Sequence, residues 1–259
     1  DFVYLHYSDP ERNQLLGFQR DDESFQKSLA HYGFIQFLKN HIDNPPIWMR
    51  EGFASYFRGL RYSNQNGASE YREYLAWLPS LKKIISRGET IPVYEMITMD
   101  SADSAAESER FYPMAWGLVD FLLHTEQPDY RRVLWDSISS LRSNAGVKEN
   151  SLLVKRKAFD WVGETGLNLA FIEYIKGKKT FSELVQAGVS AYRSKNYTEA
   201  EKQFESAMER NSNHHAPYYY LGLIRYNTGD YLKAEYFYQT ALQRGADSAV
   251  TYYALGLNA

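Results

Sequence analysis

The sequence predicts a mostly α-helical protein, in which an N-terminal α+β domain of helices and a small sheet precedes a C-terminal solenoid of helical repeats. Three observations support this fold class. The last third of the chain repeats at a step of 34 residues, the region before Phe181 holds apolar stretches of helical length separated by loops, and the first residues alternate like a strand. We place the two domains at residues 1–176 and 181–259.

The N-terminal region is predicted to contain one strand followed by helices. Residues 2–7 alternate in a period of two, which favours a strand at the front edge of a small sheet. Helices are expected where apolar residues recur at helical spacing after a cap or a proline pair. The expected helical stretches are 24–40, 47–60, 70–88, 112–126, 129–143 and 154–161. The polar stretch from Met99 to Arg110 is predicted to be a mobile loop, and residues 175–181 mark the domain boundary.

The C-terminal third has the clearest pattern. Gly188, Gly222 and Gly256 occupy the same place in a 34-residue period, where paired helices would touch. Other residues in register are Ala200 with Ala234, Phe204 with Tyr238, and Ala207 with Ala241. This pattern closely resembles tetratricopeptide (TPR) repeats, which implies repeats at 181–214 and 215–248 and a partial third at 249–259. Because each helical hairpin leaves an apolar face that only its neighbour covers, we expect the array to continue beyond Ala259.

A second resemblance lies between Pro45 and Phe57. The segment combines a Pro-Pro entry, Trp48, Glu51-Gly52, Ala54 and Tyr56-Phe57. It is similar to the helix that supplies the third zinc ligand in gluzincins, the peptidase MA-like families, and Leu29-Ala30-His31 lies where their first histidine is found. The resemblance covers residues 1–176. It implies a gluzincin-like fold, with His31 and Glu51 at ligand positions.

The chain departs from this family where the chemistry is performed. Two zinc-binding histidines must lie one helical turn apart, with a glutamate beside the first, in the pattern H-E-x-x-H. Here the five residues are His31-Tyr32-Gly33-Phe34-Ile35, so Tyr32 replaces the general base and Ile35 replaces the second histidine. A tyrosine with an ordinary pKa of about 10 cannot deprotonate water at neutral pH. We therefore interpret the domain as a pseudoenzyme without catalytic residues, metal or cofactor, and call His31, Tyr32, Ile35 and Glu51 the relic site.

Other interpretations of the relic site remain open. His31 could be a hydrogen-bonded core histidine, and Glu51 an acid that favours the first turn of its helix. An unconventional zinc peptidase would need a third ligand beside these two, such as His6 or His41. A chaperone-like holder would instead bind peptide in the old cleft, through residues such as Tyr32 and Trp48.

The TPR resemblance implies a binding surface, because the first helix of each repeat lines the concave face of such arrays. The inward positions hold Val185, Val189, Tyr192, Tyr219, Leu223, Tyr226, Tyr253 and Leu257. None of them can clamp a terminal carboxylate, so we expect them to bind an extended peptide or a helix with apolar anchors. Packing between repeats is the alternative role for these side chains. Tyr218 and Tyr252 are expected to lie at core positions.

The composition excludes several classes of function. With 29 basic and 32 acidic residues, the chain has no excess of positive charge for nucleic acid. The absence of cysteine excludes disulfides, thiolate zinc sites and cysteine nucleophiles. No run approaches the roughly 18 apolar residues of a membrane span, and no signal-peptide pattern opens the sequence.

Together these features predict a non-catalytic scaffold or adaptor that recruits a protein partner through its TPR concave face. The family resemblance alone places it in the periplasm or cell envelope of a bacterium, as a subunit of a larger complex. Motility and secretion machinery are two such settings, and no residue selects between them.

Overall fold

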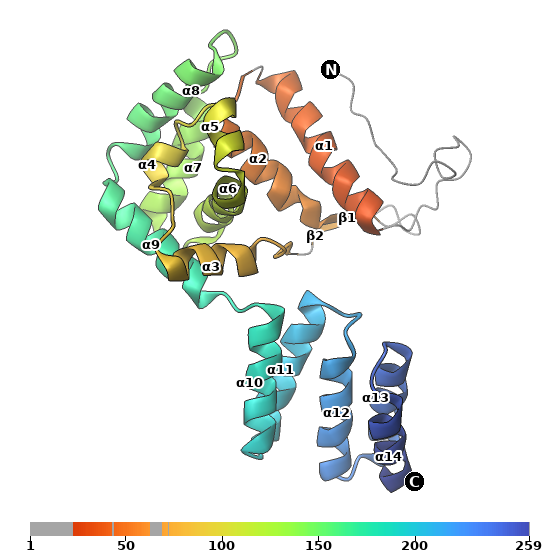
Figure 1. Ribbon diagram of the computed structural model, residues 1–259. Coiled ribbons are helices and arrows are strands. Elements are labelled where there is room, and N and C mark those ends of the chain that lie inside the picture. Colours follow the sequence, from red (N-terminus) through yellow and green to blue (C-terminus); the bar gives the residue numbers. More distant parts are fainter. Residues whose placement is uncertain (1–22, 43, 63–68, 72, 259) are drawn as a thin grey trace, which may run out of the picture. The chain divides into compact units, whose positions relative to one another are not determined.

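The structure is a computed structural model that describes residues 23–42, 44–62, 69–71 and 73–258. The chain divides into two compact units, the first ending at Lys178 and the second beginning at Lys179. Helices make up nearly all of both units (Figure 1), which confirms the predicted mostly α-helical class. Within the described ranges, no helix has both the length and the apolar character that a membrane span requires.

The first unit is built around helix α6, against which α2, α3, α5, α7 and α9 all pack. Its described elements are α1 (Glu23–His41), α2 (Ile47–Tyr56), the 3₁₀ turn η2 (Phe57–Gly59), β1 (Leu60–Tyr62), β2 (Ser69–Tyr71), α3 (Leu78–Arg87), α4 (Val93–Met96), α5 (Ser101–Ala106), α6 (Ser108–His124), α7 (Pro128–Ser140), α8 (Val147–Val154), the π-helical turn η3 (Lys155–Phe159) and α9 (Glu164–Gly177).

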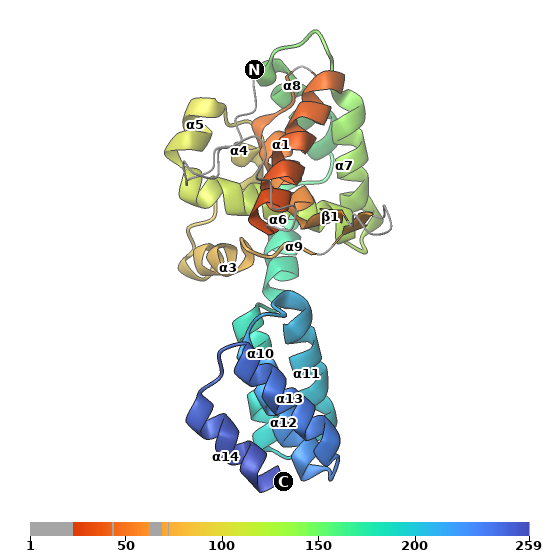
Figure 2. The ribbon, with the colours of Figure 1, turned by 90° about the vertical axis from the view of Figure 1, so that its right-hand side faces the viewer.

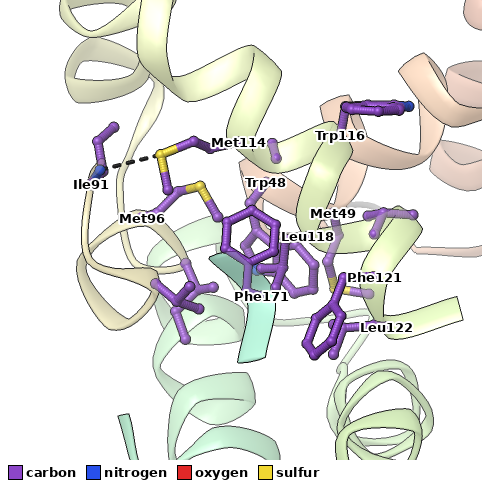
Figure 3. Packing of buried hydrophobic residues seen from close by; sticks show 14 of the residues in the cluster. Trp48, Met49, Ile91, Met96, Met114, Trp116, Leu118, Phe121, Leu122 and Phe171 are labelled. Carbon is purple, nitrogen blue, oxygen red and sulfur yellow. Dashed lines mark hydrogen bonds between the residues drawn. The ribbon is translucent and has the colours of Figure 1, made fainter. Parts of the chain in front are cut away.

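Helix α6 is central because it is apolar on all sides. Every residue from Pro113 to Leu122 is buried, as expected of a helix surrounded by other elements. Figure 3 shows side chains of this stretch, among them Met114 and Phe121, packed with Trp48 of α2 and Phe171 of α9. The α2 helix approaches closely at Gly52, where a Cβ atom would lie 2.5 Å from the backbone oxygen of Ala115. The Glu51-Gly52 pair therefore sits at a tight helix crossing.

The sheet found within the described residues is a short hairpin. β1 and β2 are antiparallel, with Leu60 opposite Tyr71 and Tyr62 opposite Ser69. The strand predicted at residues 2–7 lies outside the described residues. The predicted helix 47–60 ends at Tyr56 and is followed by η2 and β1, and the predicted helix 70–88 begins only at Leu78. Leu60 and Tyr71 instead pair in the hairpin, where the Tyr71 ring stacks on the Tyr56 ring at a distance of 4.8 Å.

The predicted mobile loop from Met99 to Arg110 is also wrong, because the segment is helical. It contains α5 and the first residues of α6. The carboxylate of Asp100 accepts hydrogen bonds from the backbone N–H groups of Ala102 and Asp103, at 2.8 and 3.0 Å, and Asp103 reaches back to the N–H of Asp100. This capping box stabilises a helix in a sequence that looks like a loop by composition.

The second unit consists of helices in consecutive pairs. Its elements are α10 (Phe181–Arg193), α11 (Tyr197–Arg210), α12 (His215–Asn227), α13 (Tyr231–Gln243) and α14 (Ser248–Asn258). α10 packs on α11 and α12 packs on α13, while α11 also contacts α12 and α13 contacts α14 (Figure 2). Asn196 and Asp230 cap the second helix of each pair through their side-chain oxygens. The pairing follows the 34-residue period of the sequence.

Candidate functional site

His31 lies on α1, where α1 packs on α2 and η2. Its side chain is buried, and its Nδ1 accepts a hydrogen bond from Nε of Arg58 at 3.3 Å. Burial and the Arg58 charge lower the pKa of His31, while a hydrogen bond to the Ala54 backbone and the Glu51 carboxylate act in the opposite direction. The ring is therefore neutral, and one of its two nitrogens is occupied by a cationic donor.

Glu51 lies on α2, close enough to His31 to influence its pKa. One carboxylate oxygen, Oε1, accepts a hydrogen bond from Nε of the adjacent Arg50 at 2.8 Å, and the side chain is only 14% exposed. Each of the two relic ligand positions thus contacts an arginine. No group of three or more His, Cys, Asp or Glu side chains suitable for a metal occurs in the described ranges.

The sequence offers two candidates for a third metal ligand. His6 lies outside the described residues. His41 is exposed at the end of α1, where its Nδ1 lies 2.9 Å from the backbone oxygen of Phe37 and its ring contacts the Phe37 ring.

Tyr32 and Ile35, which the predicted resemblance places at the general-base and second-histidine positions, lie on α1 with His31. The Tyr32 ring meets the His31 ring edge-on at a centroid distance of 5.1 Å and is 41% exposed. Ile35 is half-buried. Trp48, which the holder interpretation places in a peptide cleft, is fully buried against Phe159 in the core. It is therefore not available to a peptide at the surface.

A buried polar network in the first unit was not predicted. It centres on Asp120 of α6, which is 1% exposed, and joins it to Lys178 and Tyr174 through Oδ2 at 2.8 and 3.0 Å. Lys178 also pairs with Glu73. Nδ1 of the exposed His124 lies 3.3 Å from Asp120 Oδ1. The network therefore ties α9 and the segment after β2 to the central helix.

The pKa values of the side chains in this network are shifted by their neighbours and by burial. Burial would raise the pKa of Asp120, but His124 and Lys178 outweigh it, so that the carboxyl pKa lies below its ordinary value. The Asp120 carboxylate raises the pKa of His124. Tyr56 lies with its hydroxyl 3.4 Å from Nε2 of His124, and burial raises its pKa, so it stays protonated and is no nucleophile at neutral pH. The Asp120–His124 spacing of four residues on a predicted helix was the one signal in the sequence.

The inward positions predicted on α10 and α12 are half-buried, and those on α14 are exposed. Val185, Val189, Tyr192, Tyr219, Leu223 and Tyr226 belong to the first group. Tyr253 and Leu257 are 70% and 54% exposed. The Tyr192 hydroxyl accepts a hydrogen bond from Nδ2 of Asn227 at 3.1 Å, a polar contact between the first two repeats that sequence analysis missed. These side chains therefore pack between helices and also reach solvent.

The two tyrosines that were predicted to lie in the core differ in their exposure to solvent. Tyr218 is buried against Ala241 and Ala246, as predicted. Tyr252 is 63% exposed, so its assignment to the core was wrong in this structure. Tyr218 is covered by the second helix of its own pair and the turn that follows, whereas α14 has no such partner among the described residues.

Searches with protein-family models, among curated proteins and among solved structures found no match to this chain.

Proposed function

We propose that this protein is a non-catalytic scaffold, in which a gluzincin-like domain that has lost its zinc site precedes TPR repeats that recruit a protein partner. The observation that carries the proposal is the row of partly exposed apolar and aromatic side chains along α10, α12 and α14. Exposure rises along the row, from half-buried Tyr192 and Tyr219 to Tyr253, which is 70% exposed. Clustered tyrosines with reachable hydroxyls are typical anchors of protein interfaces.

Charged side chains on these first helices form contacts outside the row. Glu183 forms a capping box with Thr180 at the start of α10. Arg225 pairs with Glu201 of α11, with Nη1 and Oε1 2.8 Å apart. The sequence of α14, from Ser248 to Asn258, contains no charged residue. An uncharged row of this kind suits a partner segment that carries apolar anchors, as an extended peptide or a helix.

The arginines at the relic site support the non-catalytic part of the proposal. A metal ion at His31 and Glu51 would compete with Arg58 for the His31 lone pair and with Arg50 for the Glu51 carboxylate. Two fixed positive charges also oppose the approach of a cation. A catalytic zinc ion takes three protein ligands, and the described part of the chain supplies no such set.

The partner is proposed to be a protein of the bacterial cell envelope, where this chain would act as a subunit of a larger assembly. This setting rests on the resemblance of the two domains alone.

The experiment that tests the proposal is affinity capture from native extract with the whole chain and matched variants. The double variant Tyr226→Ala, Tyr253→Ala removes two members of the row. Tyr236→Ala removes a tyrosine of similar exposure, 63%, from the second-helix side of the same repeats. We expect a specific protein that wild type and Tyr236→Ala retain and the double variant loses. Equal retention by all three proteins would contradict recruitment through this row.

A further inference from the structure

Four large apolar side chains of the first unit are exposed on α7, on α8 and just after η3. Trp135 and Ile138 belong to α7, Leu152 belongs to α8, and Trp161 follows η3. Trp135 is 61% exposed, Leu152 53% and Trp161 43%. A single exposed apolar residue is ordinary, but two exposed tryptophans on neighbouring segments indicate a surface with a task.

These segments form one helical hairpin, which we call the 128–161 hairpin. At its loop end, Oδ1 of Asn150 accepts a hydrogen bond from the backbone N–H of Arg142, and Nδ2 donates to the Arg142 carbonyl oxygen, both at 3.0 Å. At its other end, the Arg132 guanidinium lies over the Trp161 ring, 5.0 Å from the ring centroid. Between these ends, α7 packs on α8 and η3. The two arms therefore run side by side in opposite directions.

Each arm of the hairpin buries one face and exposes the other. Val133 and Leu134 of α7 belong to the same core cluster as Val154 and Phe159 of the second arm. The exposed residues recur at helical spacing, at Arg132, Trp135 and Ile138 in the first arm and at Leu152 and Arg156 in the second. Because both arms pack on one core, their exposed faces together form the outer surface of the hairpin.

The hairpin is basic, although the chain as a whole is slightly acidic. Residues 128–161 contain seven basic and four acidic side chains, a net charge of +3, in a chain whose net charge is −3. One of the four acids, Asp136, is paired with Arg132 at 3.1 Å. Four of the basic side chains are exposed and form no salt bridge within the described ranges, namely Arg142, Lys148, Arg156 and Lys157. The outer surface therefore combines exposed tryptophans with available positive charge.

This combination is complementary to a bilayer surface that contains anionic lipid. Tryptophan is favoured at the boundary between headgroups and acyl chains, and Lys and Arg are attracted to anionic headgroups. Protein interfaces, by contrast, are depleted in Lys. Nucleic acid would offer phosphates to the cations but no apolar layer for Ile138 and Leu152. The lipid surface alone satisfies both the charges and the apolar side chains.

We propose that the outer surface of the 128–161 hairpin docks on a bilayer that contains anionic phospholipid. Trp135, Trp161 and Leu152 insert at the level of the headgroups, and Arg156 and Lys157 bind the lipid phosphates. The surface lies entirely in the first unit and shares no residue with the row of inward side chains on α10, α12 and α14. It therefore adds a second interaction to the recruitment of a protein partner.

The test measures cosedimentation of the whole chain with vesicles of phosphatidylcholine alone, or of equal parts of phosphatidylcholine and phosphatidylglycerol. We expect binding to the anionic vesicles to be at least about tenfold tighter than to the neutral ones, and to weaken at high salt. The double variant Trp135→Ala, Trp161→Ala removes the apolar anchors, and Arg156→Gln, Lys157→Gln removes two charges. Each should bind the anionic vesicles at least about tenfold more weakly than wild type.

The control is Arg193→Gln, Lys202→Gln, which removes the same two residue types from exposed positions of the second unit and should keep wild-type affinity. Circular dichroism of each variant shows whether its helices are retained. Absent binding to the anionic vesicles, or equal binding to both kinds, would overturn the proposal. So would undiminished binding by either variant of the hairpin. Self-association of the chain that the tryptophan variant abolishes would instead identify a second copy as the occupant, and the lipid proposal would be wrong.

Discussion

Arg58 donates a hydrogen bond from Nε to Nδ1 of His31, at 3.3 Å. In the gluzincins, to which we propose that this domain is related, the corresponding histidine binds zinc. Here burial, aided by the positive charge of the Arg58 guanidinium, lowers the pKa of the ring. His31 is part of the packing between α1 and α2, and its protonation state is an accessible reporter of the relic site.

The first prediction concerns the titration of His31 and His124, measured by NMR with His→Gln variants for assignment. His31 should titrate below its ordinary pKa of 6.5, and His124 above it, because Asp120 stabilises its charged form. The two histidines contribute to the stability of the fold with opposite dependences on pH. The contribution of neutral His31 is full above pH 6.5 and lost as the pH falls through its lowered pKa, whereas that of charged His124 is lost as the pH rises through its raised pKa.

Substitution of Arg58 tests whether its charge lowers the pKa of His31. Arg58→Gln should raise the pKa of His31 toward its ordinary value, because the repulsion between two positive charges disappears. Arg87→Gln, an exposed arginine of α3 near Glu89, is the control and should leave the His31 titration in place. An unchanged His31 pKa in Arg58→Gln would show that the guanidinium does not contact the ring in solution.

The second prediction compares two aspartates. Asp120→Ala removes a carboxylate that is 1% exposed and leaves Lys178 without one of its partners, so we expect a loss of about 3–5 kcal/mol in the free energy of unfolding. Asp136→Ala removes one half of an exposed pair with Arg132 and should cost about 0–1 kcal/mol. Urea denaturation measures both. A cost below about 1 kcal/mol for Asp120→Ala would contradict a structural role for the network.

The third prediction compares two glycines at the same place in the repeat. Gly222→Ala puts a methyl group against the Tyr238 ring and should destabilise the second unit by about 1–3 kcal/mol. Gly256→Ala meets open space, so it should be neutral or stabilise by up to about 1 kcal/mol through helix propensity. Thermal unfolding of the two variants is the measurement. Similar losses in both would show that Gly256, like Gly222, lies against a neighbouring side chain.

The helix pairs of the second unit were predictable because the residues that form their contacts recur at a fixed period. Gly188 and Phe204 recur as Gly222 and Tyr238, and a contact between neighbouring helices leaves the same trace in each repeat. Tyr252 departs from the period because no second helix pairs with α14 among the described residues. Asp100 and Asp103 have the spacing of a capping box, and this cap outweighs the loop-like composition of the segment.

The relic site and the buried network were predictable only in part. The sequence His31-Tyr32-Gly33-Phe34-Ile35 lacks the H-E-x-x-H pattern, but nothing local indicates that Arg58 would turn toward His31. The Asp120 network needs Lys178 and Glu73, which are remote in sequence and meet only in the folded chain. Such contacts have no period and no spacing rule from which to infer them.

The central claim is that the domain has kept a peptidase-like arrangement without its chemistry, and the metal content of the purified protein tests it most directly. Protein prepared without chelator should contain far less than one zinc ion per chain, and casein or peptide cleavage should not depend on Glu51. One zinc ion per chain, together with cleavage that Glu51→Ala abolishes, would contradict the account.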